Sequence, residues 1–584
     1  MFRISALAVA AVQLLLGWLL FRILQARNDL NASRTHLVAL RSALTDRNAS
    51  LAGQQADAAA RESALARRAV DDPVVRVAAA IPIVGRSFDA IRGVAKAADE
   101  TVTSVVQPLV KVVETLKPEQ LRRPDGSIDL ALLQSVKPQL DAVARRSQGI
   151  SKATNALPRS LLLAPVGHAA GQFRAQLSAL NGLVQKADIA VGIAPEMLGA
   201  RRPQRYFVML QQLGESRGTG GLIGGFAVLR ADRGRLSVEA EGTDKDLRNG
   251  PVPPSPDLPS DFVEAHRYDG TFDIWQNVNL SPDLPAVAKV IRDRWKHQTG
   301  NVIDGVIAAD ATSLADLLQG RPPLALPGRR VPVPDLEHYL AIDQYSDTAD
   351  PIARKDKLTA VAHDALQELV AGQGASADLL TGAGAAVRSG HLHVASLDAM
   401  TASSLQRLGI DGGLPLGPDP VAYAVVNNAA GSKLDYFLDR YVKYEGGACK
   451  GDRRDSTIIV TLTNHAPPVQ TLPPYTTFRR LVGGPQHSST SRVYLSVYAT
   501  RGAVLRHASL NGLVVSTVPG RTTEQLGSST EAGLPVWSIA FDTPPGHSIT
   551  LVLNVSEPRV DRAPELPEQP AARPLELHSI FHRC

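Results

Sequence analysis

RYFVMLQQLGESRGTGGLIGGFAVLR, residues 205–230, is the stretch that decides the fold of this 584-residue chain. Two apolar runs, 206–210 and 226–229, flank a glycine-rich segment, which predicts a strand, a glycine loop and a second strand. Residues before this stretch have helical periodicity, and residues after it have mixed or strand-like periodicity. We therefore predict a multidomain α+β protein with a helical N-terminal part.

The charge pattern argues against one class of partner. The net charge of +5 is spread along the chain. Nucleic-acid-binding proteins instead concentrate Lys and Arg on one patch, often with aromatic residues between them. The sequence contains no such patch, so we expect no nucleic-acid partner.

The chain has two cysteines, Cys449 and Cys584. They are too few for a cysteine-rich zinc site. Two interpretations stay open, namely two unrelated thiols or one disulfide that joins the C-terminal end to the last domain. A disulfide would fit an oxidising compartment.

Residues 4–21, ISALAVAAVQLLLGWLLF, form an uncharged run of the length that spans a bilayer as a helix. A cleaved signal peptide is the alternative, but no small-x-small cleavage site follows the run. We therefore expect an uncleaved transmembrane anchor over residues 1–21. More arginines follow the run, in residues 22–41, than the single Arg3 that precedes it. The positive-inside rule alone would thus keep the large domain in the cytoplasm.

Residues 22–200 read as a helical stalk and bundle. Leucines at heptad spacing predict a coiled-coil-like helix that packs along one side. The second seam position holds polar residues such as Arg47, which weakens the case for a two-stranded coil. Further helices near 129–157 and 167–198 complete a bundle. The heptad leucines are Leu30, Leu37, Leu44, Leu51 and Leu65.

Three further segments follow the bundle. Helix and strand patterns mix through residues 201–445, which predicts a central layered α/β domain. Short strands between residues 457 and 555 predict a β-sandwich over 446–560. The Pro/Glu-rich end, 561–584, has the composition of a disordered tail.

The glycine segment holds one acid, Glu215, and one base, Arg217. Glycine allows backbone N–H groups to turn toward an anion, and a neighbouring arginine can hold phosphate with two hydrogen bonds. Arg217, Thr219, Gly220 and Gly221 are therefore a candidate anion site. The alternative is a buried ion pair between Glu215 and Arg217 that locks the loop.

Asp283, Asp304 and Asp310 are candidate acids for the same site. Carboxylates can hold Mg²⁺ against a phosphate, which would suit phosphoryl or pyrophosphate chemistry. The structural alternative for Asp283 and Asp310 is helix capping, because each precedes a predicted helix. The sequence has no nucleophile elbow, zinc-binding His-Glu-x-x-His helix or Walker phosphate loop.

QQLGESRGTGGLIGGFAVL, residues 211–229, resembles the signature of domain-of-unknown-function family 4012. That signature reads roughly Gln-Asn-x-x-Glu-Leu-Arg-x-Thr-Gly-Gly-Phe-Ile-Gly. NVNLSPDLP, from Asn277, is similar to the second element of the family, and IDGVIAAD and AAGSKLDYFLDRYVKYE resemble further segments, so that the likeness covers about 72–558. The resemblance implies a bacterial, membrane-anchored, extracytoplasmic protein, and it implies no reaction.

The layout also resembles the LytR-CpsA-Psr glycopolymer ligases, which are membrane-anchored and handle lipid pyrophosphates with Arg and Asp residues. Two hypotheses follow. The first is an envelope enzyme acting on a polyprenyl-pyrophosphate-linked glycan, with Arg217 as phosphate clamp and the aspartates as Mg²⁺ ligands. The second is a non-catalytic envelope scaffold that binds envelope protein partners.

Overall fold

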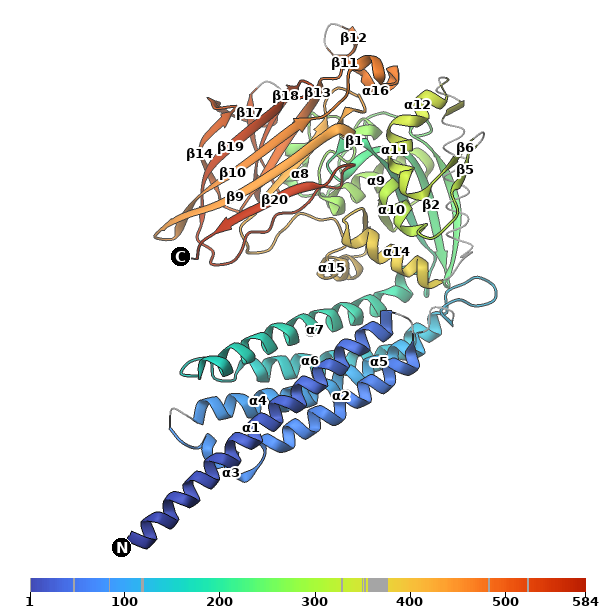
Figure 1. The fold of residues 1–584 in the computed structure, drawn as a ribbon. Coiled ribbons are helices and arrows are strands. Elements are labelled where there is room, and N and C mark those ends of the chain that lie inside the picture. The colour runs from blue at the N-terminus through green and yellow to red at the C-terminus, as the bar shows by residue number, and fades with distance from the viewer. Residues whose placement is uncertain are drawn as a thin grey trace. The chain divides into compact units, whose positions relative to one another are not determined.

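The structure is a computed structural model, and the chain forms two compact units, Met1–Glu196 and Met197–Cys584 (Figure 1). Each unit is described by itself. The division lies close to the predicted end of the helical region at residue 200. The residues that the structure describes are 2–45, 48–82, 85–116, 120–326, 329–348, 350, 353–354, 376–481, 484–522 and 525–583.

The first unit is a helix bundle, and three of the helices in its described part begin at a residue whose side chain caps the helix. Asn48 accepts a hydrogen bond from the backbone of Leu51, and Asp129 accepts one from Leu132. Such caps satisfy backbone N–H groups that have no partner inside the helix. The helices are α1 (Phe2–Thr45), α2 (Ala49–Val70), α3 (Pro73–Ala79), α4 (Gly85–Thr101), the π-turn η1 (Val102–Val106), α5 (Gln107–Thr115), α6 (Leu130–Asn155) and α7 (Ala164–Met197).

The heptad leucines do not lie on one helix, which corrects the predicted continuous stripe. α1 ends at Thr45, and Asn48 starts the separate helix α2, which lies beside α1 (Figure 1). Ala52 and Ala56 of α2 are buried, whereas Leu51 and Leu65 are 39% and 40% exposed. Alanine therefore fills part of the contact that the sequence pattern assigned to leucine.

Apolar side chains are exposed near the N-terminal end of α1. Leu14 is 75% exposed and Phe21 is 54% exposed. Within the described part of the chain, none of the helices combines the length and the hydropathy that crossing a membrane requires. The predicted transmembrane anchor therefore stays a prediction.

The second unit begins with a five-stranded sheet built on the hairpin of the opening stretch. β1 (Gln204–Arg217) pairs antiparallel with β2 (Gly220–Asp232), which confirms the predicted strand–loop–strand. β2 continues to β3 (Arg235–Thr243), while β1 pairs in parallel with β4 (Gly305–Asp310), which lies next to β7 (Leu392–Ser396). The sheet order is β3-β2-β1-β4-β7.

Aromatic side chains anchor α9 (Leu284–Thr299) against this sheet. Phe207 stacks on Phe226 with ring centroids 5.4 Å apart, and Trp295 of α9 meets Phe207 edge-on at 5.5 Å. Each such contact contributes roughly 0.5–1.5 kcal/mol beyond its buried area. The other elements are α8 (Ser260–Ala265), η3 (Trp275–Asn277), α10 (Ala311–Leu317), β5 (Leu324–Leu326), β6 (Arg329–Val331), η4 (Val333–Asp335), α11 (Leu336–His338), η5 (Tyr339–Asp343), α12 (Gln344–Asp347), α14 (Ser376–Arg388) and α15 (Ala399–Leu408).

The C-terminal half of this unit contains the predicted β-sandwich. Its sheets have the orders β15-β14-β19-β10-β9-β20 and β16-β17-β18-β13-β8, and a shared apolar core lies between them. The elements are β8 (Ala422–Asn428), η6 (Leu434–Phe437), β9 (Leu438–Lys450), β10 (Arg453–Asn464), η7 (Val469–Thr471), α16 (Pro474–Thr477), β11 (Phe478–Leu481), β12 (Gly484–His487), β13 (Ser491–Ala499), β14 (Val504–Leu510), β15 (Leu513–Val514), β16 (Thr517–Pro519), β17 (Leu526–Glu531), β18 (Leu534–Thr543), β19 (Ser548–Pro558) and β20 (Leu575–Phe581).

Two predicted boundaries are wrong. β8 and β9 belong to the sandwich, although the sequence placed them in the central domain. The C-terminal tail is ordered in its described part, because β20 pairs in parallel with β9 and Gln569 is fully buried. The Gln569 amide hydrogen-bonds both the backbone N–H and the C=O of Val426. A buried side chain thus fixes a segment whose composition alone predicts disorder.

Candidate functional site

The turn between β1 and β2 is shaped by the close approach of backbone segments. A β-bulge interrupts the pairing between Gln212 and Ser216. A Cβ at Gly218 would lie 2.3 Å from the carbonyl carbon of Ser281, and a Cβ at Gly221 would lie 2.3 Å from the carbonyl oxygen of Gln212. Only glycine fits such contacts. Packing therefore accounts for these two glycines without a bound anion.

Arg217 is directed at backbone carbonyls of the protein itself. Its guanidinium donates hydrogen bonds to the carbonyl oxygens of Gln276 at 3.0 Å and Asn428 at 3.1 Å, and also to that of Ser216. Burial lowers the pKa of Arg217 to about 10, while Asp435 opposes that shift. The predicted phosphate clamp is thus a buried group that holds three separate chain segments together.

The predicted ion pair between Glu215 and Arg217 is replaced by a different pair. Glu215 pairs with Lys433, and both side chains are buried. In a regular strand, side chains two residues apart lie on the same face. The bulge that precedes Ser216 breaks this alternation, so Glu215 and Arg217 reach different partners. Burial lowers the pKa of Lys433, and Asp435 counteracts that effect.

The polar residues of the turn are also satisfied internally. Thr219 accepts hydrogen bonds from the side-chain amides of Gln211 at 2.6 Å and Asn279 at 2.9 Å. The same two amides donate to the carbonyl of Gly221. Thr219 and Gly221, predicted to bind an anion, instead connect the hairpin to the segment before α9.

The sandwich completes this arrangement from the other side. Asp435 accepts hydrogen bonds from the backbone of Ser216 and the amide of Asn428, both at 2.9 Å. Gln569 donates to the carbonyl of Arg217 at 2.6 Å. We call this contact between hairpin and sandwich, made by Ser216, Arg217, Asn428, Asp435 and Gln569, the hairpin joint.

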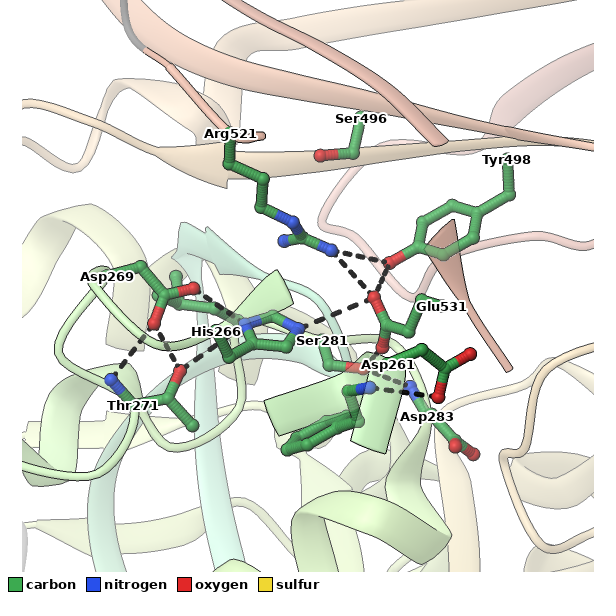
Figure 2. A network of polar contacts seen from close by, with 12 residues as sticks. Asp261, His266, Asp269, Thr271, Ser281, Asp283, Ser496, Tyr498, Arg521 and Glu531 are labelled. Carbon is green, nitrogen blue, oxygen red and sulfur yellow. Dashed lines mark hydrogen bonds and ion pairs between the residues drawn. The ribbon is translucent and has the colours of Figure 1, made fainter. Parts of the chain in front are cut away.

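A second polar contact joins the α/β domain to the sandwich (Figure 2). Glu531, at the end of β17, accepts hydrogen bonds from Ser281, Tyr498 and Arg521. Its other neighbour is His266, whose Nε2 lies 3.4 Å away. His266 in turn contacts Asp269 at 2.6 Å through Nδ1. We call His266, Asp269, Ser281, Tyr498, Arg521 and Glu531 the Glu531 cluster.

The Glu531 cluster is balanced in charge. Burial opposes protonation of His266, but the carboxylates of Asp269 and Glu531 outweigh it and raise the pKa of His266. Burial likewise opposes ionisation of Glu531, but His266 and Arg521 lower its pKa to about 2. Two cations therefore face two carboxylates, which is the condition under which buried charges are tolerated.

The Glu531 cluster resembles a serine–histidine–acid set in composition, but its serine, its histidine and Glu531 are closed to solvent. His266 and Glu531 are fully buried, and Ser281 is 1% exposed. Ser281 donates to Glu531 and accepts from the backbone of Asp283, so its hydroxyl is held by the protein. A general base must reach a substrate proton directly or through one water. The geometry thus supports a structural role for the cluster.

The three candidate aspartates have separate structural tasks. Asp310 accepts from the backbone of Ser313 in a capping box and contacts His391 at 2.6 Å. Asp304 accepts from Arg202 at 2.7 Å and from the backbone of Arg205 at 2.8 Å. The capping interpretation of Asp310 is thereby confirmed.

Asp304 and Asp310 cannot share one metal ion. Asp304 directly precedes β4 and Asp310 is its last residue. Six residues of extended strand span about 20 Å, whereas carboxylate oxygens lie about 2 Å from Mg²⁺. In the described residues, no group of three or more His, Cys, Asp or Glu is placed to hold a metal ion. The predicted Mg²⁺ site therefore has no support in the geometry.

Asp283 differs from the other two aspartates. It precedes α9 as the N-cap residue but makes no side-chain capping hydrogen bond. Burial, together with the carboxylates of Glu531 and Asp411, raises the pKa of Asp283 to about 7, although a hydrogen bond from the backbone of Leu414 opposes the shift. This carboxyl is the candidate acid that the surrounding structure stabilises least.

The turn of the hairpin also lines a cavity of about 500 Å³. Gly218 and Thr219 form part of its wall, together with residues 409, 411–417 and residues of the segment 565–570. Asp411, Glu565 and Glu568 are among the lining residues. A phosphate would meet carboxylates here, which argues against the predicted anion site.

Comparison with known proteins adds one match. Residues 201–345 match the family described as protein of unknown function (DUF4012). This confirms the family suggested by the signature. The DUF4012 match includes the hairpin and the segment before α9, and it ends before the predicted coverage to residue 558. No curated protein and no solved structure matches the chain.

The DUF4012 segment supplies only one side of each contact with the sandwich. Sequence reasoning missed His266 and Glu531. His266 and Asp269 lie three residues apart, which is the only local signal for the cluster. Glu531 lies outside the DUF4012 match and far from His266 in sequence, so no spacing could predict their contact.

The cysteines belong to the sandwich end of the chain. Cys449 lies at the end of β9 and is disulfide-bonded. Cys584, the other cysteine of the sequence, lies outside the described residues. The predicted pairing of the two stays a prediction.

Proposed function

We propose that the chain is a non-catalytic scaffold of the bacterial cell envelope, in which the signature hairpin fastens the α/β domain to the β-sandwich. The observation that carries this proposal is the use of Glu215 and Arg217. Both charged groups of the signature are buried and bound to the protein itself, Glu215 to Lys433 and Arg217 to three carbonyls.

A phosphate clamp would need different geometry. Arg217 would have to release the carbonyls of Gln276 and Asn428 to bind a ligand, and each would then be a buried acceptor without a donor. Such a loss costs about 1–3 kcal/mol for each group. The scaffold role requires no such rearrangement, and it explains why the signature residues contact the sandwich.

The envelope location is also part of the proposal. A disulfide at Cys449 supports an oxidising compartment. The exposed leucines and Phe21 of α1 support contact with lipid through the predicted single-pass anchor. The bulk of the chain would then lie outside the cytoplasm, where it would hold envelope protein partners; a glycan or lipid-linked precursor is the alternative ligand.

Substitution of Arg217 separates the scaffold from the enzyme. In the full-length chain, Arg217→Ala should lower the free energy of unfolding by about 3 kcal/mol or more, because buried carbonyls lose their donors. Binding of inorganic pyrophosphate, measured by calorimetry, should be the same in the variant and the parent. Arg267→Ala is the matched control, because the Arg267 side chain is 53% exposed.

The opposite outcome would favour the enzyme. If Arg217→Ala abolishes pyrophosphate binding and leaves the unfolding free energy unchanged, the scaffold proposal is wrong. Labelling of an Arg41→Cys variant from each side of the membrane tests the orientation. Modification only from the cytoplasmic side would refute the envelope location.

A further inference from the structure

The end of the helix bundle near the start of α1 exposes a group of apolar side chains. Each side chain of the group is more than half exposed. Single exposed apolar residues are normal on a soluble protein, whereas a group of them marks a contact with a partner or a membrane. The group, which we call the apolar rim, lies in and after α3 and in the loop before α7, and consists of Val77, Ile81, Leu161 and Leu163.

Contacts inside the first unit bring the two parts of the apolar rim to one end of the bundle. The backbone N–H of Leu163 donates to the hydroxyl of Ser87, in the first turn of α4, at 3.0 Å. The backbone N–H of Gly85, in the same turn, donates to the carbonyl oxygen of Ile81 at 2.8 Å. Figure 1 shows α3 and the starts of α4 and α7 at the end of the bundle toward which the N-terminus of α1 points.

The apolar rim lies next to the exposed apolar part of α1. Phe88 of α4 and Leu19 of α1 pack against the same apolar cluster. Trp18 donates to the carboxylate of Asp72, the N-cap residue of α3, at 3.2 Å. The leucines that precede these contacts in α1, residues 14–16, are exposed. The rim therefore continues the apolar surface with which α1 leaves the bundle.

The loop that carries Leu161 and Leu163 is held in place by the helix that follows it. Arg174 of α7 donates to the carbonyl oxygens of Leu157 at 3.2 Å and Pro158 at 3.1 Å. Leu161 has a φ of 58°, in the left-handed region that a leucine seldom adopts. An unusual backbone conformation at an exposed apolar residue is typical of positions that serve a function.

Basic residues accompany the apolar rim. Residues 73–88 and 156–168 contain three exposed arginines and neither Asp nor Glu. The acids on either side of the first segment are Asp72, which pairs with Arg22 at 3.2 Å, and Asp89. The rim thus has an excess of positive charge around it, which comes from Arg76, Arg86 and Arg159.

Apolar side chains between arginines suit the surface of a lipid bilayer. The apolar groups can enter the boundary between headgroups and acyl chains, and the arginines can bind anionic headgroups. A second copy of the chain is a poorer occupant, because it would bring two sets of the same three arginines together.

We propose that the apolar rim rests in the surface of the bilayer that holds α1, with Arg76, Arg86 and Arg159 at anionic headgroups. Such a contact rests on the proposed function, because it requires α1 to be the membrane anchor. A single helix would tether the bundle and leave its tilt free. A second contact through the rim would fix how the bundle stands on the membrane, which suits a scaffold.

Fluorescent labels on the rim test the proposal. The full-length chain is reconstituted into vesicles of phosphatidylcholine and phosphatidylglycerol, with an environment-sensitive dye on Leu161→Cys or Val77→Cys. Lipids brominated at known depths should quench both labels, most strongly at the shallow positions, because interfacial helices insert about 5–10 Å. The parent chain, treated with the same dye, gives the background from Cys449 and Cys584.

Val113→Cys is the matched control. Val113 of α5 is exposed, and the neighbouring Glu114 lies beside Gly53, near the start of α2 and so at the far end of α1. The brominated lipids should not quench its label. In vesicles of phosphatidylcholine alone, quenching at Leu161 should fall, because the arginines lose their anionic partners.

Flotation of the vesicles on a density gradient separates two failures. A chain that does not float with the vesicles refutes the anchor of the proposed function and the rim contact together. A chain that floats, with rim labels quenched no more than the label at Val113, refutes the rim contact alone. A blue-shifted label that brominated lipid does not quench would show that protein covers the rim, and it too would overturn the proposal. Equal quenching with and without phosphatidylglycerol would refute the role of the arginines.

Discussion

Glu531→Gln is the most informative single change in the second unit. The substitution keeps the shape of the side chain and removes its charge. In the parent chain the Glu531 carboxylate faces two cations, Arg521 at 2.7 Å and His266 at 3.4 Å, and accepts from the hydroxyl of Tyr498 at 2.7 Å. The amide of glutamine would turn an N–H group toward donors.

The expected loss follows from these contacts. Removing one partner of a buried ion pair costs about 3–5 kcal/mol, because the remaining charge stays buried without compensation. Here Asp269 remains as the single carboxylate for two cations. We therefore expect Glu531→Gln to lower the free energy of unfolding by about 3–5 kcal/mol.

Urea unfolding measured by tryptophan fluorescence tests this value. Trp275 and Trp295 report on the α/β domain, and Trp537 reports on the sandwich. Because the cluster joins the two, both regions should lose stability in the variant. Glu576→Gln is the matched control, since the Glu576 side chain is 68% exposed and pairs only with His578 among the contacts described. It should change the free energy by less than about 0.5 kcal/mol.

A small effect would refute the reasoning. If Glu531→Gln changes the unfolding free energy by less than about 1 kcal/mol, the buried charges are not compensated as the structure indicates. Solvent would then reach the cluster, and the conclusion that it is structural would lose its basis.

The raised pKa of His266 means that protonation favours the folded state. The contribution of His266 to the free energy of unfolding is therefore complete below pH 6.5 and is lost as pH rises through the folded-state pKa. Urea titrations from pH 6 to 9 should show this loss in the parent and not in His266→Gln. Asp283 is an acid and not a base, but its raised pKa of about 7 also makes the folded state less stable as pH rises, because folding favours the neutral carboxyl. Asp283→Asn should therefore stabilise the chain by up to about 4 kcal/mol at pH 8. The effect should vanish well below pH 3.8, where the carboxyl is protonated in the folded and the unfolded state. Equal effects at pH 8 and at pH 3 would contradict the shift. Gly218→Ala should lower the melting temperature sharply, since its Cβ would meet the backbone of Ser281 at 2.3 Å; an unchanged melting temperature would show that the turn has room.

The hairpin and the sandwich strands were predictable because both depend on local periodicity. Tyr206 to Leu210 and the alternation in β10 and β13 are visible in sequence. The break between α1 and α2 was not predicted, because a heptad leucine pattern continues across Asn48. Periodicity describes which residues share a face, and a cap that begins a new helix leaves that pattern intact.

The candidate site was harder to predict for a different reason. The sequence correctly singled out Arg217 and Asp310, and it left open whether each of them binds a ligand or has a structural role. Arg217 contacts Asn428, and Asp310 contacts His391. Both partners are more than eighty residues away in the chain, so the spacing of residues in the sequence carries no information about these contacts. Burial of a charged side chain, which decides between ligand binding and structure, depends on the whole fold.

The contacts of Gln569 affect the order in which the second unit folds during synthesis. This residue and β20 lie near the C-terminal end, yet they complete the hairpin joint and the edge of the larger sandwich sheet. During synthesis, which proceeds at about 5–20 residues per second, the hairpin emerges long before its last partner. The second unit can therefore close only after Gln569 and β20 have left the ribosome. A chain that ends before Gln569 lacks the donor to the carbonyl of Arg217 and the strand that pairs with the edge of β9.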